Sequence, residues 1–235
     1  MTMIAGSIFF ALLGKPPGIV LYSFFVEPFT NTYNISEILI KAGPLILIAQ
    51  GLAIGFRANV WNIGAEGQLV IGAIAAGLIP IYAPEPSGPW MLPAMLVVGA
   101  AAVFTLSRTT FGAAVYGIGN REGAAYLSGV PTQRVLVAAF AVSGGLAALG
   151  GVLLAGYAGK AAQSMGDVYL LPAIAAVVLG GTSILGGRGK YIGTVAGVIL
   201  VTLLQSILSV MQMPEAGRQI IYGVVIAAML LAYGR

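Results

Sequence analysis

The chain has 235 residues, of which 59% are hydrophobic and only 8% are charged. Soluble domains carry about 25% charged residues, so this composition excludes a soluble protein and indicates an integral membrane protein. The formal charge is +4, but the basic residues form no cluster, which argues against nucleic-acid binding. The absence of cysteine and histidine excludes a disulfide framework, thiol chemistry and the usual proton shuttle and metal ligand.

The predicted fold class is all-α: a polytopic membrane protein with about seven or eight transmembrane helices, some of them broken by glycine. Strand-length alternation of the kind that marks a membrane barrel is missing, so the spans are expected to be helical. Glycine, at 34 residues, has about twice its usual share, which suits close helix packing in lipid. We expect a single transmembrane permease domain over residues 1–235.

Apolar segments long enough to cross a bilayer, which takes roughly 20 residues, follow one another along the chain. Met1–Leu13 is too short and is predicted to be the second half of a helix. The predicted spans are Glu37–Phe56, Ile63–Tyr82, Trp90–Leu106, Val135–Ala158, Val168–Gly187, Tyr191–Met213 and Gln219–Gly234. Counting the first segment makes eight, which places both termini on the same side as the loop between the two helical halves.

That loop, Ser107–Arg134, is the longest stretch that is not lipid-like. It carries three arginines and one acid, so the positive-inside rule predicts that it faces the cytoplasm. Its middle, Arg121–Leu127, is predicted to be a short helix that Gly119-Asn120 leads into and that Ser128–Pro131 ends. A soluble partner could grip such a helix, and an ordinary connecting loop is the alternative.

A polar stretch, Asn59–Gln68, interrupts the apolar sequence at the mouth of the second predicted span. Polar side chains at membrane depth normally face protein or a water-filled cavity. The i, i+4 step from Asn62 to Glu66 predicts that both lie on one helix face. The stretch therefore favours a polar-lined substrate path, and an interhelical hydrogen-bond cluster is the alternative. The candidate path residues are Asn59, Trp61, Asn62, Glu66 and Gln68.

A second broken stretch, Gly180–Lys190, contains two glycine pairs. Two glycine-interrupted segments in opposite halves are typical of the substrate path of a transporter. Nucleotide binding is excluded there because the stretch lacks the Walker pattern. Gly144–Gly151 indicates a helix-packing seam. No paired-carboxylate arrangement suggests catalysis, and Glu66, the acid that lies well inside an apolar run, is too isolated for a proton relay or a metal site.

Three blocks of the sequence resemble the permease subunits of bacterial ABC importers for simple sugars and nucleosides. Pro44–Ala73 is similar to the nucleoside-type permeases, Arg108–Val130 to the cytoplasmic coupling region of the family, and Ile174–Leu200 to its ribose-type members. The chain also lacks a block between Pro89 and Leu106 and the start that family members have before Met1. It therefore looks like a truncated, internally deleted or recombined permease.

The resemblance implies the transmembrane subunit of an ATP-binding-cassette importer, which moves a nucleoside or simple sugar across the cytoplasmic (inner) membrane by alternating access. It implies no enzymatic activity and no cofactor in this chain, because a partner subunit would bind the ATP. The implied partners are a cytoplasmic ATPase subunit, a second permease subunit, an extracytoplasmic solute-binding protein and the membrane lipid. A stand-alone channel or secondary carrier, or a degenerate scaffold that does not transport, remains the alternative.

The resemblance also implies roles for individual residues. It places Asn59–Gln68 at or near the translocation core and the coupling helix within Gly117–Ser128. The residues expected to couple to the ATPase are Gly119, Asn120, Arg121, Glu122, Ala124, Ala125 and Ser128.

Overall fold

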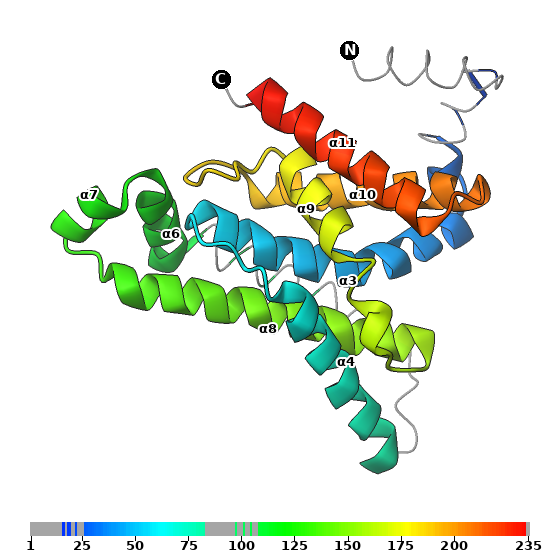
Figure 1. The fold of residues 1–235 in the computed structure, drawn as a ribbon, viewed down its shortest axis with the longest axis horizontal. Helices are drawn as coiled ribbons and strands as arrows, with labels where there is room; N and C mark the ends of the chain where they lie inside the picture. Colours follow the sequence, from blue (N-terminus) through cyan, green and yellow to red (C-terminus); the bar gives the residue numbers. More distant parts are fainter. Residues whose placement is uncertain are drawn as a thin grey trace.

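The computed structural model describes residues 26–82 and 108–233, together with positions 16, 18, 19, 22, 97, 101 and 104. Every regular element within this part of the chain is a helix (Figure 1), so the all-α prediction is confirmed. The elements in chain order are η1 (Glu27–Phe29), α3 (Thr32–Arg57), α4 (Ala65–Tyr82), α6 (Thr110–Asn120), α7 (Glu122–Leu127), α8 (Thr132–Ala158), η2 (Gln163–Met165), α9 (Leu170–Leu179), α10 (Tyr191–Val210) and α11 (Glu215–Tyr233).

Three of the described helices are long and apolar enough to cross a membrane, namely Thr32–Arg57, Thr132–Ala158 and Tyr191–Ser209. They coincide with three of the predicted spans and confirm a polytopic membrane protein. The α4 and α11 helices also form where spans are predicted. The segments predicted at residues 1–13 and 90–106 lie outside the described residues, apart from isolated positions.

The span predicted at residues 168–187 is only partly helical, so that prediction is wrong. Its helix, α9, has 10 residues and ends at Leu179, which corresponds to about 15 Å, half of the roughly 30 Å that a bilayer core requires. The chain then leaves helical geometry because Gly181 has a φ of 78° and Gly186 a φ of 94°. These left-handed conformations suit glycine and end the helix.

The α3 helix is the central element of the bundle (Figure 1), since it packs against α8, α9 and α10. Most of its side chains are buried, whereas the α8 and α10 helices keep large exposed faces. Leu45, Ile48 and Leu52 of α3 form one core with Val177 of α9 and Val198 of α10. The most buried of the three long helices is thus the one whose C-terminal end adjoins both candidate polar segments.

Glycine allows the helices to cross with their backbones in contact. A Cβ atom on Gly72 of α4 would overlap the carbonyl oxygen of Ala148 in α8, and one on Gly151 would overlap that of Leu69. A Cβ on Gly51 of α3 would lie 2.7 Å from the carbonyl oxygen of Ser143. The predicted packing seam at residues 144–151 is confirmed, and it holds both α3 and α4 against the middle of α8.

Candidate functional site

The predicted substrate path falls largely in a loop, residues 58–64, between α3 and α4. Asn59 adopts a left-handed conformation with a φ of 57°, and its side chain is exposed. Trp61 is 52% exposed, and its ring lies 5.4 Å from that of Phe56. The prediction that Asn62 and Glu66 share one helix face is wrong because α4 begins at Ala65, after Asn62.

Asn62 is the buried member of this group and connects the loop to two helices. Its Nδ2 donates hydrogen bonds to Oε1 of Gln68, at 2.8 Å, and to Oγ of Ser143 in α8, at 2.9 Å. Its Oδ1 atom is buried and has no hydrogen-bond partner among the described residues. The structure thus brings Asn62 and Gln68 together in an interhelical cluster, which Asn59 and Trp61 do not join.

Glu66 lies at the start of α4. The sequence suggested that it is isolated from other acids, and the structure shows that it is not. Its carboxyl group interacts with that of Asp167, in the turn between η2 and α9. The backbone of Gly166, next to Asp167, is also close to Glu66, since a Cβ atom on Gly166 would lie 2.8 Å from Cγ of Glu66. The sequence carries no signal for this carboxyl pair, because the two acids come from opposite halves of the chain.

The residue that the sequence analysis missed is Arg57, at the end of α3. Its side chain is fully buried, and its Nη2 donates a hydrogen bond to Oγ1 of Thr182 at 3.1 Å. The guanidinium lies over the ring of Tyr191, 3.4 Å from the centroid, and 5.5 Å from that of Tyr116. Its Nε and Nη1 atoms have no hydrogen-bond partner within the described part of the chain. Aromatic faces therefore take the place of a carboxylate around this cation.

The backbone of Arg57 also joins three segments at one end of the bundle. Its carbonyl oxygen accepts a hydrogen bond from the backbone N–H of Gly187, at 3.1 Å. A Cβ on Gly119 of α6 would overlap the same oxygen. The end of α3 is therefore fixed to α6 and to the glycine-rich loop 180–190. No local sequence pattern indicates this role for Arg57, since its partners are distant in the chain.

The short helix predicted between the two halves exists as α7, so this prediction is confirmed. Arg121, with an extended φ of −159°, precedes it, and the Oγ of Ser128 donates to the carbonyl oxygen of Ala124 at its end. Gly129 follows with a φ of 83°. In contrast to the prediction, Gly119 and Asn120 do not form a lead-in but the last turn of α6.

The α7 helix lies at one extreme of the molecule (Figure 1) and packs mainly against α6 and α8 within the described residues. Tyr126 is 68% and Leu127 87% exposed. Of the seven predicted coupling residues, Arg121, Glu122, Ala124 and Ser128 are exposed, as is Asn120 of α6. Ala125 is buried in the core beside Val115, and Gly119 faces Arg57, so neither is placed to touch a partner.

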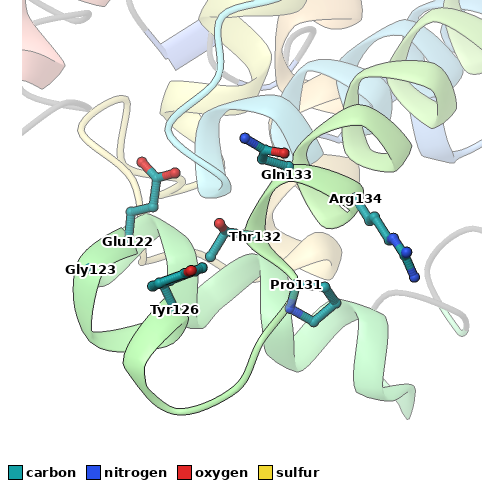
Figure 2. Close-up of a pocket in the computed structure, with 7 residues that line it drawn as sticks. All are labelled: Glu122, Gly123, Tyr126, Pro131, Thr132, Gln133 and Arg134. Carbon is teal, nitrogen blue, oxygen red and sulfur yellow. The ribbon is translucent and has the colours of Figure 1, made fainter.

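A pocket of about 630 Å³ separates α7 from the first turn of α8. Figure 2 shows the ring of Tyr126 directed toward Thr132, whereas the side chain of Arg134 extends away from α7. The pocket carries opposite charges, Glu122 on α7 and Arg134 on α8. This arrangement presents a short exposed helix beside an open pocket. The residues that line it are Glu122, Gly123, Tyr126, Pro131, Thr132, Gln133 and Arg134.

The sequence of this all-helical membrane protein matches a known family. The family described as branched-chain amino acid transport system / permease component matches residues 34–105 and 94–232. The chain belongs to this family. No solved structure matches it significantly.

Relatives with described roles include several sugar permeases. The chain is 37% identical to the ribose import permease protein of Haemophilus influenzae, over 94% of this chain and 64% of the relative. It is 36% identical to the xylose transport system permease protein of Escherichia coli, over 75% and 44%. It is 34% identical to the galactose/methyl galactoside import permease protein of H. influenzae, over 83% and 54%. The chain thus spans about half of the length of these relatives.

Proposed function

We propose that this protein is the permease subunit of an ATP-binding-cassette importer for a simple sugar, and that α7 docks the ATPase. The observation that carries the proposal is the geometry of α7, an exposed helix set apart at one end of the bundle beside an open pocket. The similarity to ribose, xylose and galactose permeases supports a sugar rather than a nucleoside as the substrate.

In the proposed arrangement the protein lies in the inner membrane, and the α7 end of the bundle faces the cytoplasm. Basic residues support it, because Arg121 and Arg134 flank α7 and Arg188 and Lys190 lie in the loop that packs against α6. Positive charge near short loops favours the cytoplasmic side. The partners in this arrangement are the ATPase, which binds the ATP, a second permease subunit and an extracytoplasmic solute-binding protein.

The proposed mechanism is alternating access, in which movement of the ATPase displaces α7. The α7 helix continues into α8 through residues 128–131, and α6 carries Gly119 against the Arg57 carbonyl. A displacement of α7 would therefore reach α8 directly and the end of α3 through α6. The polar cluster of Asn62, Gln68 and Ser143 lies between these helices, and we place the substrate path beside it.

The test is recovery of the cognate ATPase with the purified permease. Ala124 is exposed on α7, so Ala124→Arg adds a bulky charge to the proposed interface. Burial of an unpaired charge costs several kcal/mol, and we expect at least tenfold less ATPase at equal membrane levels. The matched control is Ala161→Arg, at an exposed position of the loop after α8, which should recover as much ATPase as the wild type.

Equal recovery with Ala124→Arg and wild type would contradict the role of α7. A wild type that recovers no ATPase would favour the channel, carrier or scaffold instead.

A further inference from the structure

A second large pocket lies at the end of the bundle opposite to α7. Its volume is about 520 Å³, within the range of roughly 300–1,000 Å³ that small-molecule sites occupy. Residues from the first half of α3, the end of α8, the start of α9, the second half of α10 and the start of α11 line it. None of the residues that the sequence singled out for the substrate path belongs to this lining.

The polar lining of this pocket comes mainly from one face of α10. Thr202, Gln205, Ser206 and Ser209 are spaced i, i+3, i+4 and i+7, so they lie on one side of an otherwise apolar helix. The Oγ of Ser206 donates to the carbonyl oxygen of Thr202 at 3.0 Å, and that of Ser209 to the carbonyl oxygen of Gln205 at 2.8 Å. Each serine oxygen therefore keeps its lone pairs as acceptors.

Thr202 provides the strongest sign of a missing ligand. Its side chain lines the pocket and is 1% exposed, and its Oγ1 has no hydrogen-bond partner among the described residues. A buried hydroxyl without a partner is uncommon in folded proteins because it loses its hydrogen bonds to water. A hydroxyl group of a solute bound in the pocket would satisfy it once the Thr202 side chain turns toward the pocket.

The charged groups at the pocket are already paired within the protein. Nζ of Lys41 lies 2.7 Å from Oε2 of Glu37, and Nη1 of Arg218 lies 3.8 Å from Oε2 of Glu215. The Nε of Arg218 also donates to the carbonyl oxygen of Met213, at 3.0 Å. The described residues of the pocket thus offer no unpaired charge for an ionic ligand, and their other hydrogen-bonding groups are neutral.

Three tyrosines complete the lining, Tyr157 at the end of α8, Tyr169 before α9 and Tyr222 in α11. The exposed ring of Tyr157 provides flat apolar surface, whereas Tyr222 is buried with its hydroxyl toward the Gln205 side chain, and the tyrosine hydroxyls act as donors and acceptors. Neutral hydroxyl and amide groups beside aromatic rings match a solute that has hydroxyl groups on one side and C–H groups on the other. A monosaccharide has this chemistry, whereas an amino acid or a phosphate would leave its charges unpaired.

We propose that this pocket binds a neutral monosaccharide on the side of the membrane opposite to the ATPase, with the Thr202 hydroxyl and the Gln205 amide as its hydrogen-bonding contacts. The assignment of a sugar rests on the proposed function. The location rests on the pocket, the polar face of α10 and the unpartnered hydroxyl.

The test is direct binding to the purified full chain in detergent, by calorimetry with ribose, xylose and galactose as separate probes and uridine as a fourth. Thr202→Val removes the hydroxyl and keeps the shape, and we expect about three- to tenfold weaker binding of the preferred sugar. Gln205→Leu should weaken it similarly. Thr202→Ser should restore binding, and Thr110→Val, at an exposed position of α6, should bind like the wild type.

Sugar binding that is equal in wild type, Thr202→Val and Gln205→Leu would overturn this location. A wild type that binds uridine and none of the sugars, or none of the four probes, would overturn the ligand class. Each of these outcomes is independent of ATPase recovery, so this site can fail while the importer assignment stands. Conversely, sugar binding that depends on Thr202 in a protein that recovers no ATPase would support the site and contradict the importer.

Discussion

The guanidinium of Arg57 lies 3.4 Å from the centroid of the Tyr191 ring, with both side chains buried. A desolvated cation over an aromatic face is stabilised by about 2 kcal/mol. Within the described residues the charge forms no ion pair, so the ring and the Thr182 hydroxyl carry most of the compensation for its burial. This contact joins the first half of the chain to the second.

Tyr191→Leu should therefore destabilise the protein by about 2–4 kcal/mol, through the lost cation–π contact and a cavity. Tyr191→Phe is the matched control, since it keeps the ring and removes a buried hydroxyl that lacks a hydrogen-bond partner among the described residues. Its stability should equal or exceed that of the wild type. Thermal unfolding of the purified proteins measures the stability of both variants. Equal melting temperatures for Tyr191→Leu and Tyr191→Phe would contradict the role of the ring.

The backbone contact between α4 and α8 predicts that Gly72→Ala disrupts folding. The added Cβ would overlap the Ala148 carbonyl, and overpacking of this kind typically costs about 1–3 kcal/mol. Gly67→Ala lies on the same helix with nothing within 4 Å of its Cβ, and should gain up to about 1 kcal/mol of helix propensity. Size-exclusion yield and melting temperature compare the two variants. A Gly72→Ala protein as stable as Gly67→Ala would show that α4 does not cross α8 at this point.

The proximity of Glu66 and Asp167 predicts that they are coupled. Glu66→Gln and Asp167→Asn should each raise the melting temperature slightly, through a gain of less than about 1 kcal/mol in the free energy of unfolding, because each keeps a hydrogen bond between the two side chains and removes the repulsion between partly exposed carboxylates. The double variant should gain less than the sum of the single gains. Additive gains in this double-mutant cycle would mean that the two side chains do not interact in the membrane.

The proposed orientation predicts opposite accessibility for the two ends of the bundle. Because the chain contains no cysteine, single cysteines report position without a background. Leu127→Cys in α7 should resist an impermeant thiol reagent in intact cells and react after lysis. Ala161→Cys, at the opposite end, should react in intact cells. The reverse pattern would invert the topology and place α7 outside the cell.

The helices that were predicted correctly are those whose sequence signals lie within the helix or directly at its ends. Long apolar segments predicted α3, α8 and α10. The glycine that follows a short run of small residues predicted the end of α7. The prediction at α9 failed because the span was extended into the glycine stretch 180–190, whose left-handed glycines end the helix at Leu179. The i, i+4 argument for Asn62 failed because the helix starts three residues later.

Long-range partners could not be predicted in the same way. The environment of Arg57 is built from Tyr116, Thr182 and Tyr191, and only the fold brings these segments together. The same holds for Glu66 and Asp167. The polar face of α10 is different, because the helical spacing of Thr202, Gln205 and Ser209 that forms it is visible in the sequence.

The crossing of α8 by α3 and α4 has a mechanical consequence. The tight backbone contacts of α8 lie at residues 143–151, near the middle of a helix of 27 residues. Such a helix is about 40 Å long, so a tilt of about 10° around its centre moves the two ends by about 3.5 Å in opposite directions. One end adjoins the α7 pocket, and the other carries Tyr157. A tilt of α8 about this glycine crossing would therefore turn an inward displacement at one membrane surface into an outward displacement at the other.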